Sequence, residues 1–128
     1  MCFAIFTPKF FAVQGLRSSV FDANLATREL SDQFHDLVLL EGSREAILSR
    51  FSSFSYQNES PEILNEITVP TLIIHGEEDN IIPVISSKNL ASNIPNTKLI
   101  IYPEIGHLPM YESPKRVARD IETFLSKF

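Results

Sequence analysis

Two short segments in the second half of the chain each place a residue with acid-base chemistry directly after an apolar run. The first segment, residues 75–83, contains Asp79, and the second, residues 106–109, contains His107. A carboxylate that accepts a hydrogen bond from an imidazole fixes the tautomer of the ring and stabilises the imidazolium that forms when the ring takes up a proton. Asp79 and His107 are therefore candidates for the acid and the base of a catalytic triad.

The nucleophile of such a triad is not evident in this sequence. The chain has four glycines, which are Gly15, Gly42, Gly76 and Gly106. No two of them lie four positions apart, so a Gly-x-Ser-x-Gly or Gly-x-Asp-x-Gly nucleophile elbow cannot be present. Four serines are nucleophiles by residue type: Ser18, Ser19, Ser86 and Ser87. None of them occupies a strand-to-helix elbow, and a serine without an oxyanion hole is a poor catalyst.

Three further residues have reactive side chains but are not candidates for a site. We expect His75 to pack at the end of a strand, and His35 to lie on a helix flank that offers no acid at metal-ligand spacing. Cys2 has no residue nearby in sequence that would orient it, so we expect it to be inert. None of the three is therefore a candidate for a catalytic or metal-binding role.

Composition and charge exclude several kinds of partner. The formal net charge is -5, and the eleven lysines and arginines are scattered, which argues against nucleic acid. The single cysteine rules out an internal disulfide and suits a reducing compartment, so we expect a cytoplasmic location. The apolar residues 1–13 lack a basic leader and are interrupted by Pro8 and Lys9. They are also too short to span a bilayer, so we expect a buried segment and no membrane partner.

Helical patterns dominate the chain up to Pro70. Apolar residues recur at i, i+4, i+7 and i+8 in residues 27–40, with Thr27 placed to cap the start. A second helix is predicted from Ser43, with an apolar face that includes Phe51 and Phe54. A third, short helix is predicted from Pro61 up to Val69 and Pro70.

Strand patterns appear after Pro70. Residues 71–75 and 98–102 are short runs rich in β-branched residues, ended by Gly76 and Pro103, and we expect both to be buried strands. Residues 84–93 are compatible with a helix between them, which predicts a parallel pair with a right-handed crossover. Ser113 and Pro114 open a last amphipathic helix, which we expect to pack on the sheet. Two strands make a poor sheet alone, so one strand edge is expected to be exposed and able to self-associate.

The residues from Pro70 to Asp79 with Pro83, then Gly106-His107 and the closing helix, resemble the C-terminal end of an α/β-hydrolase. Residues 8–10, 17–22, 27–30 and 42–47 resemble the helical cap of members related to epoxide hydrolases, haloalkane dehalogenases and carbon-carbon bond hydrolases. The resemblance implies an α/β fold in which residues 1–69 form a cap-like segment and residues 70–128 hold the last two parallel strands and their helices. It also implies Asp79 as triad acid and His107 as triad base.

The family resemblance implies hydrolysis of a small ester, epoxide, halide or carbon-carbon substrate, with a serine or an aspartate as nucleophile and without a metal ion or an organic cofactor. Because the upstream strands, the elbow and the oxyanion hole are absent, we expect this chain to be a fragment that is inactive alone and binds substrate only when an N-terminal half completes it. The alternative is a non-catalytic binding module that uses the exposed strand edge. For the two site residues, the alternatives are a loop aspartate that caps the helix near Val84, and a histidine that bonds a backbone carbonyl.

Overall fold

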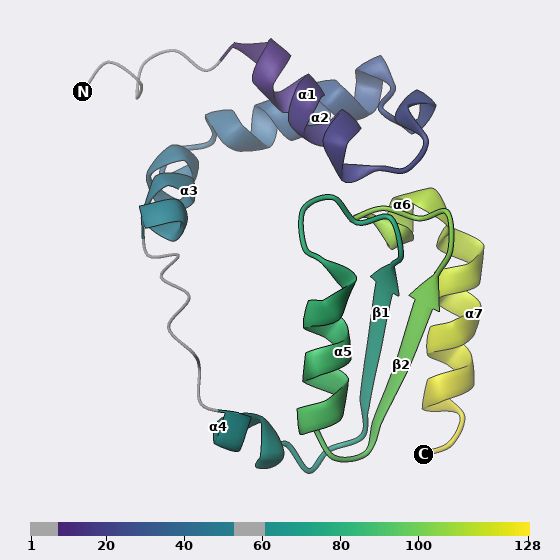
Figure 1. Ribbon diagram of the computed structural model, residues 1–128. Coiled ribbons are helices and arrows are strands. Elements are labelled where there is room, and N and C mark those ends of the chain that lie inside the picture. Colours follow the sequence, from purple (N-terminus) through teal and green to yellow (C-terminus); the bar gives the residue numbers. More distant parts are fainter. Residues whose placement is uncertain (1–7, 53–60) are drawn as a thin grey trace.

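The computed structural model describes residues 8–52 and 61–128 (Figure 1). The elements before the gap are α1 (Lys9–Ser19), the 3-10 turn η1 (Ala23–Leu25), α2 (Arg28–Leu39) and α3 (Ser43–Ser52). The elements after it are α4 (Pro61–Asn65), β1 (Thr71–Gly76), α5 (Val84–Asn93), β2 (Thr97–Tyr102), α6 (Pro109–Glu112) and α7 (Pro114–Leu125). The interpretations of Cys2, of Phe54, of residues 1–7 and of the Phe51 side chain fall outside what the structure describes.

The second half of the chain forms the predicted parallel unit. Strands β1 and β2 pair in parallel, in a register that places Thr71 opposite Thr97 and Gly76 opposite Tyr102. Helix α5 makes the crossover between them, and α5 and α7 lie on either side of the strands (Figure 1). The strands are half-buried along most of their length rather than fully buried as predicted, because in the described residues each pairs with only one neighbour.

Tyr102 at the end of β2 anchors the last helix. Its side chain is fully buried, its hydroxyl donates a hydrogen bond of 2.6 Å to Asp120 on α7, and the Arg116 guanidinium lies 3.9 Å from the ring centroid. Burial, with the adjacent Asp120 carboxylate, raises the pKa of Tyr102 to about 12. Helix α7 (Pro114–Leu125) therefore contacts Tyr102 through Arg116 and Asp120, while Leu125 and Phe128, at the end of the predicted apolar stripe, are exposed.

Helices α1, α2 and α3, here called the helical segment, lie beyond the carboxyl ends of the strands, whereas α4 lies near their amino ends (Figure 1). Helix α1 packs on α2, and α2 packs on α3. Thr27 caps α2 as predicted, because its hydroxyl accepts a hydrogen bond from the Leu30 amide. The ring of Phe34 on α2 meets the ring of Tyr111 on α6 edge to face, with centroids 6.3 Å apart. The segment is thus joined to the end of the sheet where the two candidate residues lie.

Several local expectations were wrong. Residues 9–13 form the start of helix α1, and Phe10 and Phe11 are each 63% exposed instead of buried. A continuous apolar run has no period, so it did not indicate a helix. Helix α4 ends at Asn65 rather than near Val69. Ser113 precedes α7 as expected but makes no capping hydrogen bond with its side chain. In the described ranges, no helix is both long and apolar enough to cross a membrane.

Candidate active site

The two candidate residues lie in loops that leave the same end of the sheet. The loop after β1 carries Asp79, and the loop after β2 carries His107. The Glu77 amide donates to the Tyr102 carbonyl at 2.8 Å, and the Glu78 amide donates to the Ile105 carbonyl at 3.0 Å. These bonds extend the pairing of the parallel strands past their ends. The sequence separation of 28 positions between Asp79 and His107 is thereby closed.

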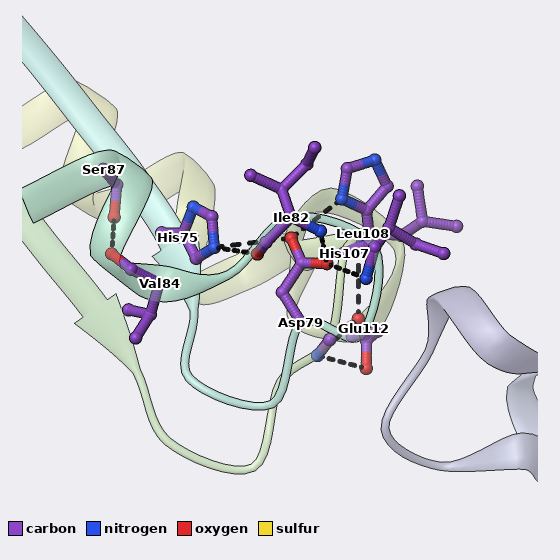
Figure 2. A network of polar contacts seen from close by, with 10 residues as sticks. His75, Asp79, Ile82, Val84, Ser87, His107, Leu108 and Glu112 are labelled. Carbon is purple, nitrogen blue, oxygen red and sulfur yellow. Dashed lines mark hydrogen bonds and ion pairs between the residues drawn. The ribbon is translucent and has the colours of Figure 1, made fainter. Parts of the chain in front are cut away.

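Asp79 and His107 are in direct contact (Figure 2). Oδ2 of Asp79 lies 2.8 Å from Nδ1 of His107. The side chain of Asp79 is only 4% exposed, whereas that of His107 is 38% exposed. An ionised carboxylate can only accept hydrogen bonds, so the neutral imidazole must carry its proton on Nδ1, which makes Nε2 the acceptor. The pair thus has a buried carboxylate bonded to one ring nitrogen of a half-exposed imidazole.

The environment of Asp79 keeps it ionised. Burial by itself raises the pKa of this carboxyl, but hydrogen bonds from the Ile82 amide, from His107 and from the Ile81 amide outweigh it, and the net pKa is below the usual value. The Ile81 and Ile82 amides donate to Oδ1 at 2.8 and 2.9 Å. Asp79 therefore closes its own loop and does not cap α5, whose first turn follows Pro83.

A second histidine lies beside the acid, which the sequence did not reveal. Nε2 of His75, at the end of β1, donates to the Ile82 carbonyl at 3.0 Å and lies 3.4 Å from Oδ2 of Asp79 (Figure 2). The side chain is 12% exposed. The prediction that His75 packs at the end of the strand is consistent with this burial, but the ring also faces the carboxylate. The spacing of four residues from His75 to Asp79 was the only available signal.

Glu112 is the other residue that sequence reasoning missed. It ends the four-residue helix α6, which is too short to give a periodic pattern. Its carboxylate accepts hydrogen bonds from the amides of Phe21, Gly106 and Leu108. Two of these amides belong to the loop of His107, so Glu112 is part of the structure that holds the candidate base.

A cavity of about 230 Å³ opens beside the pair and is lined by His75, Asp79, Ile82, His107, Pro109 and Met110, together with the end of β1. It is smaller than most ligand sites, which hold about 300–1,000 Å³. None of the four candidate serines lines it. The hydroxyls of Ser19 and Ser87 donate to backbone carbonyls of their own helices, at 2.7 and 2.9 Å. Within residues 8–52 and 61–128, no three acidic, histidine or cysteine side chains are placed to hold a metal ion.

The family model for the alpha/beta hydrolase fold matches residues 20–114, which include both candidate loops. This chain belongs to the alpha/beta hydrolase fold family. Among its curated relatives is a 2-hydroxymuconate semialdehyde hydrolase of Pseudomonas putida, 32% identical over 111 residues, which cover 83% of this chain and 40% of the relative. Another is the uncharacterized hydrolase YugF of Bacillus subtilis, 30% identical, with 88% of this chain and 41% of the relative covered.

Solved structures of hydrolases agree with the fold described above. The meta-cleavage product hydrolase CumD from Pseudomonas fluorescens, solved as a mutant, superposes with a TM-score of 0.78 at 27% identity, over 95% of this chain and 47% of that one. A thermophilic esterase from Thermogutta terrifontis superposes with a TM-score of 0.71, also at 27% identity, over 94% and 44% of the two chains. The α/β fold and the hydrolase resemblance predicted from the sequence are thereby confirmed. The chain spans about two fifths of the length of these curated relatives.

Proposed function

We propose that this chain supplies the acid and the base of a hydrolase active site, Asp79 and His107, to a nucleophile and an oxyanion hole that lie outside this sequence. The observation that carries the proposal is the 2.8 Å contact between the buried, ionised Asp79 and Nδ1 of His107. That contact leaves Nε2 as the atom that would take a proton. The sequence itself has no elbow motif to provide the nucleophile.

The chemistry follows from this tautomer. Nε2 of His107 takes the proton of a serine hydroxyl or of a water molecule as the oxygen attacks the substrate, and the ring becomes an imidazolium. Asp79 stabilises that cation, and the proton passes from Nε2 to the leaving group when the bond breaks. A small ester or carbon-carbon substrate is the class to expect, since relatives are called a 2-hydroxymuconate semialdehyde hydrolase and an esterase. The helices α1 to α3 would act as a cap over this end of the sheet, and the reaction would take place in the cytoplasm.

A chimeric enzyme tests the proposal. The chain would replace the aligned 111 residues of the Pseudomonas putida relative, which supplies the remainder of its own sequence. We expect the chimera, but not the isolated chain, to hydrolyse a chromogenic ester, with activity lowered roughly 10³-fold or more by His107→Ala or Asp79→Asn. His35→Ala on α2 is the matched histidine control and should retain activity. Equal turnover before and after His107→Ala would contradict the proposed role.

A binding module without catalysis is the second candidate, and one observation favours it. Within the described residues β1 pairs with β2 alone, so the other edge of β1 carries backbone groups available to a further strand. Under this hypothesis the isolated chain would self-associate, and analytical ultracentrifugation would show its mass rising with concentration. A chimera whose activity depends on His107 would rule out a purely non-catalytic role.

A further inference from the structure

One carboxylate bonds the amides on both sides of His107. Glu112 accepts from the Gly106 amide at 2.9 Å through Oε1 and at 3.1 Å through Oε2. It also accepts from the Leu108 amide at 3.2 Å through Oε1 (Figure 2). The Glu112 amide in turn donates to the Leu108 carbonyl at 3.0 Å, so Leu108 and Glu112 are bonded to each other through two hydrogen bonds across α6. The backbone of His107 is thus fixed from before and after by a single side chain.

The same carboxylate reaches the helical segment, 91 positions earlier in the chain. The Phe21 amide, between α1 and η1, donates to Oε2 of Glu112 at 2.7 Å. The amide of His107 itself donates to the Ser19 carbonyl at 2.7 Å. A Cβ placed on Gly106 would lie 2.7 Å from that carbonyl oxygen and 2.9 Å from the Phe21 nitrogen, so the two segments are packed backbone against backbone.

Three consecutive amides, those of residues 106, 107 and 108, therefore all donate to acceptors outside the loop between β2 and α6. The amides of Gly106 and Leu108 share one charged acceptor, the Glu112 carboxylate, and hydrogen bonds to a charged acceptor are stronger than those between neutral groups. If the carboxylate is lost, the amides of Phe21, Gly106 and Leu108 lose an acceptor at once. The loop keeps the bond from the His107 amide to Ser19 and the bond from the Glu78 amide to Ile105, but neither of these engages the amides on the two sides of His107. The direction of the His107 ring depends on the path of this loop.

We propose that Glu112 is a positioning residue that holds the loop of His107 in the one path that brings Nδ1 to Asp79, and that ties this loop to the segment between α1 and η1. The inference rests on the proposed function, because positioning matters to chemistry only if His107 is the base. Glu112 acts through His107 and does not line the cavity beside it.

The test compares Glu112→Gln, Glu112→Ala and, as the control, Glu122→Gln, which makes the same charge change at an exposed position on α7. Nitrogen NMR of the imidazole at pH 8 measures the share of His107 that carries its proton on Nδ1, in the 128-residue chain. Amide hydrogen exchange at Phe21, Gly106 and Leu108 reports the bonds to residue 112. We expect exchange at these amides to quicken about tenfold or more, with a fall in the Nδ1–H share, in both Glu112 variants but not in the control.

Two further measurements separate positioning from stability and from the proposed function. Tyr102→Phe removes the hydroxyl that donates to Asp120 on α7, a bond that involves neither Glu112 nor residues 106–108, and should leave the Nδ1–H share unchanged. Asp79→Asn in the otherwise unchanged chain should lower that share. If it does not, the Asp79 and His107 pair fails, and with it the proposed function, whatever Glu112 does.

The inference about Glu112 is overturned if exchange quickens while the Nδ1–H share stays as in the unchanged chain, because Glu112 would then be a structural tie alone. It is also overturned if Tyr102→Phe lowers the share equally. If neither Glu112 variant folds, amide hydrogen exchange in the unchanged chain tests the inference instead. There the four amides of Phe21, Gly106, His107 and Leu108 should exchange at similar slow rates, and fast exchange at Gly106 or Leu108 would overturn the inference.

Discussion

A methyl group added at Gly76 tests how closely the two loops of the site are packed. The Cβ of an alanine there would lie 2.0 Å from the Gly106 carbonyl oxygen and 2.3 Å from the Ile105 carbonyl oxygen. Both contacts are with backbone, which cannot rotate away as a side chain can. The Gly106 loop also leads directly into His107, so the substitution pushes on the base as well as on the fold.

The size of the effect follows from these distances. Ordinary van der Waals contacts begin near 3.4 Å, so the two loops must separate by more than 1 Å. Overpacking of this kind costs about 1–3 kcal/mol and sometimes more. The movement also breaks the bond from the Glu78 amide to the Ile105 carbonyl, which contributes about 0.5–1.5 kcal/mol. We expect Gly76→Ala to lower the free energy of unfolding by about 3–4 kcal/mol, a large part of the 5–15 kcal/mol typical of a domain.

Urea denaturation followed by circular dichroism measures this loss. Gly15→Ala is the matched control, because Gly15 lies inside α1 and an added Cβ there has nothing within 4 Å. Alanine favours a helix over glycine, so the control should gain about 0.5–1 kcal/mol. An unfolding free energy for Gly76→Ala within about 1 kcal/mol of the unchanged chain would refute the reasoning, since the loops would then not be in contact.

Two pH-dependent effects follow from the titrating groups. The pKa of Asp79 is lowered by folding, so its contribution to stability is complete above its unfolded pKa of about 3.9 and is lost as the pH falls through the lower folded value. Urea midpoints measured from pH 6 to pH 3 should therefore fall less in Asp79→Asn than in the unchanged chain. Parallel curves for the two proteins would contradict this. The pKa of Tyr102 is raised to about 12, so its contribution is complete below the unfolded value of about 10 and is lost as the pH rises toward 12. Tyr102→Phe should lower stability modestly at neutral pH and flatten this alkaline loss, which midpoints measured between pH 9 and pH 11 would reveal; an equally steep decline in the variant would argue against the buried Tyr102 to Asp120 contact.

Local sequence signals were enough for the elements that have strong patterns. The two strands are β-branched runs with breakers after them, and α2 begins at a capping threonine, so their types followed from the chain alone. Helix α1 was missed because a run rich in phenylalanine has no helical period, and the exposure of Phe10 and Phe11 depends on packing that no local pattern encodes. Helix α6 was missed because four residues are too few to form a pattern.

The site divides in the same way. Asp79 and His107 could be named because each follows a strand and occupies a family-like loop, and the structure brings their side chains together; their catalytic roles stay a prediction. His75 and Glu112 could not be named, since neither lies in a motif that indicates a role. The significance of Glu112 depends on its bond to the Phe21 amide, 91 positions away, and a contact at that separation exists only once the chain has folded.

The change in composition near residue 70 remains a predicted division of the chain, but the hydrogen bonds cross it at the point that matters for chemistry. The amide of His107 is bonded to Ser19, and the carboxylate that holds its neighbours is bonded to Phe21, so the path of the base is set from both sides of the division. A shift of the segment between α1 and η1 would therefore move the loop of His107 with it. Asp79 is held by the Ile81 and Ile82 amides of its own loop, and the Glu78 amide bonds that loop to the Ile105 carbonyl, so a shift of the His107 loop would act on the contact between acid and base. The helical segment, if it acts as a cap, would thus be coupled to the position of the base.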